Sequence, residues 1–229
     1  MNESGPGSNF QNFNPDFGDY KKRTGITSDA GGLLEGLWSM ERDRNIAKLE
    51  RDYPGIGVEF DKLIELLPDA EDPGKIEFPF ASAVLRKNKD GKMEVLARSM
   101  NMVKHNNDST QHAEVVVLQE AQRAIGDRHL DNCIILTTAQ PCEMCAGAMR
   151  NCGIGTVVYG ISQEEMKGKH VKFGDEFKPI RTVPKGVDTD ATLIDAGIEV
   201  IAGYKHDEVL AKLTRFVGTF KAYYEDPDA

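Results

Sequence analysis

The 229-residue sequence has few cysteines and no long apolar run. Four cysteines are too few for a disulfide scaffold, which excludes a disulfide-dense secreted domain. No stretch of about 18 apolar residues occurs, so we expect no membrane-spanning helix. Residues 1–8 are polar and glycine-rich and lack the apolar segment of a signal peptide, so we expect a cytoplasmic protein.

Positive charge is also scarce. Lys and Arg number 28 against 37 Asp and Glu, which gives a net charge of −9. Proteins that hold nucleic acid electrostatically present a basic face, so this balance makes a nucleic-acid partner unexpected. Apolar residues make up 40% of the chain and charged residues 28%, which predicts a packed core and one domain of ordinary size.

The first third of the chain differs from the rest. Residues 1–32 are rich in Asn, Gly, Ser and Asp, and they predict a disordered tail whose spaced aromatics leave docking open as an alternative. Apolar spacing predicts a helix over 33–53 and a shorter one near 58–67. Residues 33–75 are therefore interpreted as a helical extension, packed either on the main domain or on another subunit.

Residues 76–229 are interpreted as the main domain. Strands are expected at 80–86, 93–98, 134–138, 156–160 and 198–202, and helices at about 110–125, 141–151 and 206–217. Residues 161–190 are rich in Lys, Gly and Asp and predict a long loop, the kind that often serves as a lid. The alternation predicts an α/β fold, a three-layer α/β/α sandwich around a central mixed sheet of about five strands.

The residues that carry chemistry lie in two short segments. The first is His112-Ala113-Glu114 and the second is Pro141-Cys142-Glu143-Met144-Cys145, each expected at the start of a helix. Cysteines at this spacing share one face of a helix. Two thiolates and an imidazole provide three ligands for tetrahedral Zn²⁺, and a site with three protein ligands keeps its fourth position for water, as catalytic zinc does.

Glu114 is expected to act on that water rather than on the metal. Glu114 and His112 can face one site only if the end of their helix points into it, which suggests Thr110 or Ser109 as the N-cap. Pro141 is likewise expected in the first turn of the second helix. A carboxylate beside zinc-bound water can take its proton and pass it on.

Two other interpretations of the cysteines remain. A lone Cys-x-x-Cys is also a redox motif. A structural zinc site is the other interpretation, with Cys133, Cys152, His105 or His129 as a further ligand. The combination of His-x-Glu with a later Pro-Cys-x-x-Cys favours the catalytic zinc of nucleobase deaminases. We therefore expect the other two cysteines to be buried apolar residues, and the other two histidines to lie at the surface.

From about Phe80 to Gly160 the chain resembles the cytidine deaminase-like superfamily, and most of all the branch with tRNA adenosine, guanine and fungal-type cytosine deaminases. The resemblance implies that His112, Cys142 and Cys145 bind zinc. It also implies that zinc-bound hydroxide attacks the amino-bearing carbon while Glu114 moves protons. The chain departs from the pattern at Gln140, where relatives often have Glu, and at Ser109, where they often have Pro.

The resemblance also implies residues that contact the substrate. Asn101 matches a position that holds the base, and its amide can both donate and accept hydrogen bonds, although a turn asparagine is the alternative. Ala113, between the metal ligand and the proton carrier, is assigned to the same pocket. Independently of the resemblance, the acidic side chain of Asp175 is a candidate for reading a ring N–H or an exocyclic amine, with a solvated loop residue as the alternative.

The sequence thus predicts a zinc-dependent aminohydrolase that acts on a small nucleobase or nucleoside of guanine, cytosine or adenine type. A tRNA adenosine deaminase is the alternative enzyme, although the net charge of −9 weighs against it. A non-catalytic, zinc-stabilised interaction module is the alternative from another class. By the same resemblance we expect a homodimer.

Overall fold

The computed structural model describes residues 33–67, 78–166, 170–173, 176–179 and 188–216. Its central sheet has five strands in the order β2-β1-β3-β4-β7. Their bounds are β1 (Ala81–Lys87), β2 (Met93–Met100), β3 (Cys133–Ala139), β4 (Thr156–Ile161) and β7 (Glu199–Ile201). Strand β1 is antiparallel to β2 and β3, whereas β3, β4 and β7 run parallel, so the predicted mixed sheet is confirmed.

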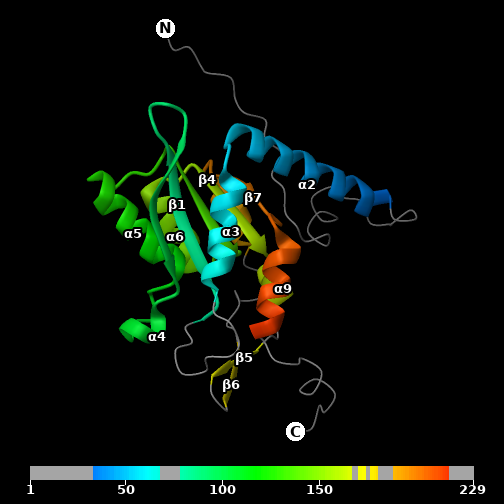
Figure 1. The fold of residues 1–229 in the computed structure, drawn as a ribbon, viewed down its shortest axis with the longest axis vertical. Helices are drawn as coiled ribbons and strands as arrows, with labels where there is room; N and C mark the ends of the chain where they lie inside the picture. The colour runs from blue at the N-terminus through cyan, green and yellow to red at the C-terminus, as the bar shows by residue number, and fades with distance from the viewer. Residues whose placement is uncertain (1–32, 68–77, 167–169, 174–175, 180–187, 217–229) are drawn as a thin grey trace.

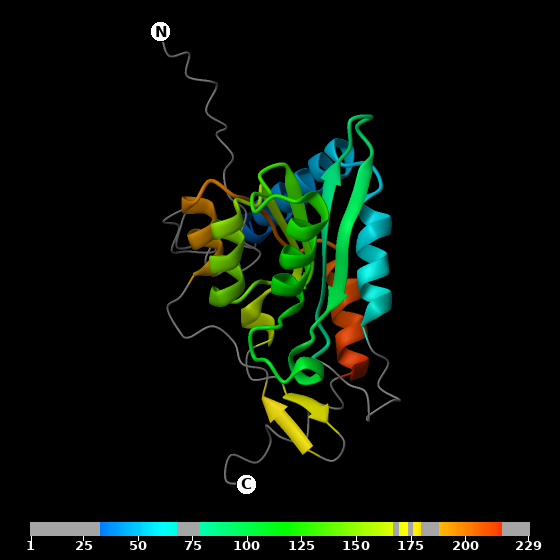
Figure 2. The same cartoon turned by 90° about the vertical axis from the view of Figure 1, so that its left-hand side faces the viewer.

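Helices cover both faces of this sheet (Figures 1 and 2). On one face lie α5 (Ala113–Ile125), α6 (Glu143–Cys152) and α8 (Thr189–Asp195). On the other lie α3 (Ile56–Leu66), α9 (His206–Phe216) and the end of α2 (Leu33–Asp52). Strands β3 and β4 are buried at every position because helices cover them on both sides. The three-layer α/β/α sandwich is confirmed.

The helices of residues 33–67 pack on the chain's own sheet. Phe60 and Leu63 of α3 are fully buried with Leu136 of β3, and the Phe60 ring meets Tyr204 edge-on at 5.1 Å between centroids. Leu49 near the end of α2 joins the same cluster. The alternative of packing on another subunit is therefore not needed to bury this apolar face.

The expected loop over residues 161–190 is partly wrong. It holds the short helix α7 (Gln163–Met166) and a hairpin of β5 (His170–Phe173) and β6 (Glu176–Pro179), and α8 begins at its end. A further short helix, α4 (Val103–Asn106), was not predicted. Elements of four residues are too short to show an apolar period, so the pattern is silent about them. The hairpin lies at the same end of the molecule as α4 in both views (Figures 1 and 2).

The boundaries at residues 32 and 75 stay predictions because residues 1–32 and 68–77 lie outside the described part of the chain. Within that part, no helix combines the length and the apolar character needed to cross a membrane. Gly153, the residue that ends α6, has the left-handed backbone with φ 66°. A Cβ there would lie 2.5 Å from Asp131 Oδ1, so both the backbone conformation and the available space favour glycine.

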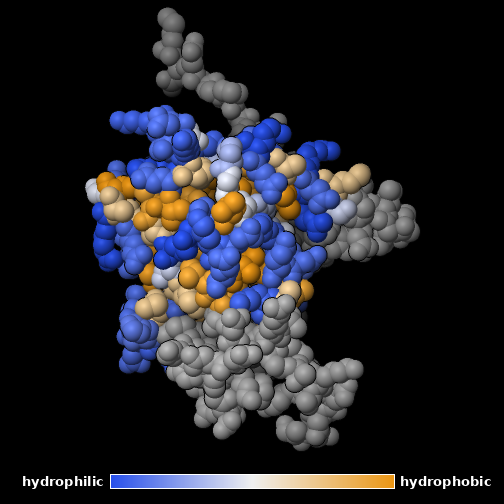
Figure 3. All heavy atoms as spheres, viewed as in Figure 1, coloured by the Kyte–Doolittle hydropathy of each residue, from blue (hydrophilic) through white to orange (hydrophobic). Residues whose placement is uncertain are grey.

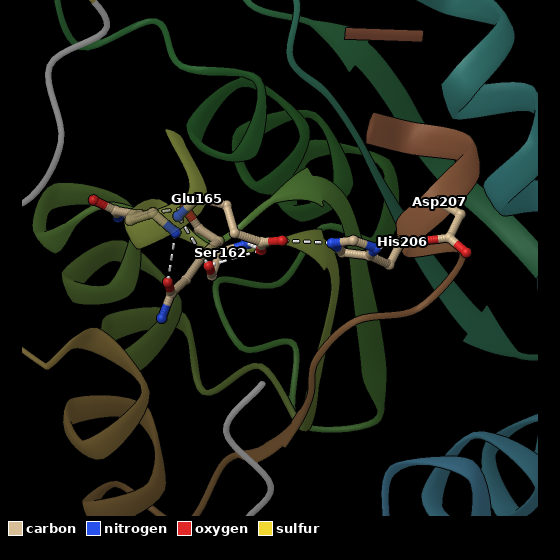
Figure 4. A network of polar contacts seen from close by, with 6 residues as sticks. Ser162, Glu165, His206 and Asp207 are labelled. Atoms are coloured by element: carbon tan, nitrogen blue, oxygen red, sulfur yellow. Dashed lines mark hydrogen bonds and ion pairs between the residues drawn. The ribbon is translucent and has the colours of Figure 1, made fainter. Parts of the chain in front are cut away.

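His206 at the start of α9 contacts Glu165 of α7, the short helix that follows β4 (Figure 4). His206 Nε2 lies 2.5 Å from Glu165 Oε1, and the other carboxylate oxygen accepts the N–H and O–H of Ser162, both at 2.8 Å. The hydrogen bond to Glu165 raises the pKa of His206 to about 9. Burial acts to raise the pKa of Glu165, but the bonds from His206 and Ser162 outweigh it and lower that pKa to about 2.

Replacing His206 with glutamine is expected to lower the free energy of unfolding by about 1 kcal/mol at pH 6, a modest value because screening weakens partly exposed pairs. The contribution of His206 is complete below its ordinary pKa of 6.5 and is lost as the pH rises through about 9. That of Glu165 is complete above 4.5 and is lost as the pH falls through about 2. Denaturant unfolding should therefore show the largest difference between the wild type and the variant between pH 4.5 and 6.5, and almost none above pH 9.

Exposed His129, replaced in the same way, is the control and should change stability by less than about 0.5 kcal/mol. A difference that does not vary with pH would contradict the role of the pair.

Candidate metal centre

Three donor atoms converge where α5 and α6 begin. The Sγ atoms of Cys142 and Cys145 lie 3.5 Å apart, and each lies 3.5 Å from His112 Nδ1. Among the described residues, these three side chains form a group whose donor atoms could hold a metal ion. The two sequence segments, separated by β3, therefore meet at one point as predicted.

The triangle of donor atoms fits zinc. Zinc binds cysteine sulfur at about 2.3 Å and histidine nitrogen at about 2.0–2.1 Å, and tetrahedral angles then place ligand atoms about 3.5–3.8 Å apart. The observed separations of 3.5 Å match three corners of that tetrahedron. Two thiolates and one imidazole also suit the ligand preference of Zn²⁺.

Each metal-binding segment places a ligand at the N-cap of a helix. His112 caps α5 and Cys142 caps α6, with φ and ψ of −63° and 149° for the first and −74° and 172° for the second. The expectation of Thr110 or Ser109 as the cap of α5 is wrong, and Pro141 precedes the cap of α6 instead of lying in its first turn. Both helix N-termini thus point at the cluster, where their partial positive charge stabilises thiolates.

The three side chains influence each other's ionisation. The hydrogen bonds with Cys145 and then His112 lower the pKa of Cys142 to about 4 in spite of its burial. The hydrogen bond with Cys142, reinforced by burial, raises the pKa of Cys145, and the same residue raises the pKa of His112. The pair therefore favours a proton on Cys145 over one on Cys142, and both thiols would be deprotonated when a metal binds.

Glu114 lies in the first turn of α5 and is 6% exposed. Burial raises the pKa of its carboxyl to about 7, and the neighbouring Cys142 thiolate adds to the effect. The carboxyl also forms a hydrogen bond with Cys145. A carboxyl group with a pKa near 7 can both accept and return a proton at neutral pH.

The alternative fourth ligands do not reach the cluster. Cys133 and Cys152 are 3% exposed and belong to the hydrophobic core between the sheet and α5 and α6. His105 and His129 are exposed. None of these four belongs to the metal-binding group among the described residues. Three protein ligands, rather than four, are typical of a catalytic zinc.

The structure places two of the three predicted substrate residues. Asn101 follows β2, is 2% exposed, and its Oδ1 accepts the N–H of Val103 at 3.1 Å, which is a contact that a turn asparagine makes. Ala113 is buried as the first residue of α5. Asp175 lies outside the described residues.

The sequence did not predict a polar network beside the centre, and three of its four residues were not singled out. Gln140, Tyr159, Gln163 and Asp190 form one hydrogen-bonded network around the strand end that leads to Cys142. Asp188, whose side chain accepts the N–H of Ala191 at 2.9 Å, is a helix-start signal that could have located α8. No sequence signal indicates that Asp190, in a Lys- and Asp-rich segment, is 1% exposed.

A mixed sheet between two helical layers, with a His and two Cys at helix starts, defines the class of zinc-binding α/β deaminases. The chain matches the family model for the cytidine and deoxycytidylate deaminase zinc-binding region over residues 61–161. It is 34% identical over 114 residues to the guanine deaminase of Bacillus subtilis, which covers 46% of this chain and 69% of that one. The chain therefore belongs to this family.

Other similarities differ in extent and in identity. The chain is 40% identical over 74 residues to the tRNA-specific adenosine deaminase of Buchnera aphidicola, which covers 32% of this chain and 49% of that one. A solved structure of the guanine deaminase from Nitrosomonas europaea shares the fold with a TM-score of 0.57 and 23% identity, over 71% of this chain and 85% of that one. The chain spans between 14% and 69% of the first relatives it matches.

Proposed function

We propose that the protein is a zinc-dependent hydrolytic deaminase that releases ammonia from a small nucleobase or nucleoside. The observation that carries the proposal is the buried Glu114 carboxyl beside the three donor atoms. A purely structural zinc site needs no such group, because burying a carboxyl beside a thiolate is unfavourable. The alternative of a non-catalytic interaction module leaves Glu114 unexplained.

The proposed mechanism divides the work among a few residues. His112, Cys142 and Cys145 hold the zinc, which when bound lowers the pKa of water and so supplies a nucleophile at neutral pH. Glu114 takes a proton from the attacking water and gives it to the ring nitrogen of the base. It then takes the second proton, from the hydroxyl group that has been added to the base, and gives it to the leaving amine. Its pKa of about 7 suits both directions of transfer.

Two further residues are proposed to orient the base. The Oδ1 of Asn101 is fixed by the N–H of Val103, which fixes the amide plane and leaves Nδ2 as the donor toward a substrate carbonyl or ring nitrogen. Ala113 is the first residue of α5, so its N–H has no partner within the helix and is proposed as a second donor. Asp175 stays a third candidate.

The choice of substrate rests on the relatives and on charge. A guanine-type base leads, because the guanine deaminase of Bacillus subtilis is a relative of which the chain spans 69%. A tRNA adenosine deaminase is the second candidate, because several relatives carry that name. The net charge of −9 supports the free base or nucleoside over a polyanion.

One survey separates these candidates. The purified full chain, loaded with zinc, is incubated with guanine, cytosine, adenine, their nucleosides and tRNA, and ammonia is measured. Release from a single base or nucleoside supports the proposal, and inosine formation in tRNA alone would favour the second candidate. Release from none of them, with zinc bound, would favour the interaction module.

The proposal includes a homodimer in the cytoplasm. All four cysteines are free, as expected in a reducing compartment. On α2 and α3 the side chains of Met40, Val58 and Leu66 are exposed, although Figure 3 shows hydrophobic residues interspersed with hydrophilic ones on this face. Sedimentation at twice the chain mass of 25.3 kDa would support a dimer, and a monomeric profile would contradict it.

A further inference from the structure

Asp190, near the start of α8, is a buried acidic residue outside the metal centre. It is 1% exposed, and both of its carboxylate oxygens accept hydrogen bonds. Oδ1 accepts from Gln140 Nε2 at 2.9 Å, and Oδ2 accepts from the hydroxyl of Tyr159 at 2.7 Å. Both oxygens of the Asp190 side chain are thus engaged by donors from two different parts of the chain.

Gln140 passes this restraint to the backbone that leads to Cys142. Its Oε1 accepts the N–H of Gln163 at 2.9 Å. The side-chain Nε2 of Gln163 then donates to the carbonyl of Pro141 at 2.8 Å and to that of Gln140 at 3.4 Å. The side chain of Asp190 is therefore connected by two glutamines to the peptide unit directly before the metal ligand.

This peptide segment has no polar backbone group left unpaired. The N–H of Gln140 donates to Ile161 at 2.8 Å, both carbonyls accept from Gln163, and Pro141 has no N–H. Cys142 follows at once as the N-cap of α6. Its Sγ can stay 3.5 Å from both other donor atoms only while this turn keeps its place.

Tyr159 fixes the far side of the network. Its ring is fully buried in the core below α6, and burial together with the nearby Asp190 carboxylate raises its pKa well above the ordinary value. The hydroxyl thus remains a donor throughout the neutral range. The carboxylate of Asp190 is therefore clamped between strand β4 and the segment that follows β3.

We propose that Asp190 is a positioning residue for the metal centre, which acts through Gln140 and Gln163 to hold the turn that presents Cys142. This role rests on zinc being bound by Cys142, as in the proposed function, but not on any particular substrate. Loss of the network should leave the fold in place and let the Cys142 ligand move away, which accelerates the release of zinc.

A reciprocal exchange of amide and carboxylate tests the network. In Gln140→Glu the oxygen that accepts the N–H of Gln163 can remain, but a second carboxylate now faces Asp190. In the double variant Gln140→Glu/Asp190→Asn, the new asparagine amide donates to position 140 and its oxygen accepts from Tyr159. The hydrogen bonds between positions 140, 159, 163 and 190 are then restored, and the negative charge has moved from position 190 to position 140.

The experiment measures the rate at which the zinc-loaded full chain gives up its metal to an excess of a chromophoric chelator. We expect Gln140→Glu and Tyr159→Phe to release zinc at least about tenfold faster than the wild type, within the range that residues supporting metal ligands show. The double variant should return to within threefold of the wild type. Tyr204→Phe is the matched control, because the Tyr204 ring is also fully buried and its hydroxyl donates to Glu50 on the opposite side of the sheet.

The outcomes separate positioning from plain structural support. If Tyr159→Phe and Tyr204→Phe accelerate zinc release equally, or if the double variant is as fast as Gln140→Glu, the proposal is wrong. Should Gln140→Glu fail to fold, the comparison of the two tyrosine variants decides alone. Ammonia release plays no part in this assay, so failure of the proposed deamination would leave the result interpretable.

Discussion

Replacing Glu114 with glutamine is expected to abolish deamination, with a fall in kcat of about 10²- to 10⁴-fold, the usual share of a positioned general acid and base. Glutamine has almost the same shape, but it can neither accept nor return a proton. Glu114 is not among the three donors of the metal cluster, so the zinc content should stay near one per chain. The variant should be at least as stable to unfolding as the wild type, because burial opposes ionisation of the carboxyl group that it removes.

The control for this variant is Glu120→Gln on the exposed side of the same helix. It makes the same chemical change and should leave kcat, KM and zinc content as in the wild type. Metal analysis and single-turnover ammonia release on both variants give the comparison. Activity in Glu114→Gln within tenfold of the wild type would remove the carboxyl from the mechanism, and loss of zinc would reassign it to the metal centre.

The parts of the site that depend on residue type were predictable from the sequence. The spacing of Cys142 and Cys145 places them on one helix face, and the pairing with His112 across β3 follows from the order of helix, strand and helix. The predicted helix starts were two or three residues too early, since α5 begins at Ala113 and α6 at Glu143. Thr110 and Ser109 are good capping residues, but Asp108 already accepts the N–H and O–H of Thr110, so the chain turns there before α5 begins.

The network behind the cluster was out of reach for a different reason. Gln140 was recognised only as a departure from the family pattern, and Asp190 had the appearance of a solvated loop residue. Their contact spans 50 positions of the chain and joins the end of β3 to α8. Local patterns report on periodicity and capping, whereas burial of a polar residue depends on which strands become neighbours. The order β3-β4-β7 supplies that information only once the sheet is formed.

Replacing Cys145 with serine is expected to remove the zinc and the activity together. A serine hydroxyl does not ionise at neutral pH and is a poor ligand for a thiolate-preferring metal, so two ligands remain. Metal affinity should fall by at least about 100-fold, at or beyond the upper end of what changes around metal ligands cause. Cys152→Ser is the matched control, because Cys152 is buried on the same helix and its Sγ donates to the carbonyl of Met149. That variant should keep one zinc per chain and its activity.

Thermal unfolding distinguishes loss of a ligand from loss of the fold. Zinc binds the folded chain, so treatment of the wild type with a chelator should lower its melting temperature. Cys145→Ser should melt close to the chelated wild type, and chelator should change it no further, because the metal contribution is already gone. Cys152→Ser should instead respond to chelator as the wild type does. If Cys145→Ser melted well below the chelated wild type, Cys145 would contribute mainly to the packing of the core. The loss of activity would then not be evidence about zinc. Equal melting temperatures with no activity would tie catalysis to the metal held by His112, Cys142 and Cys145.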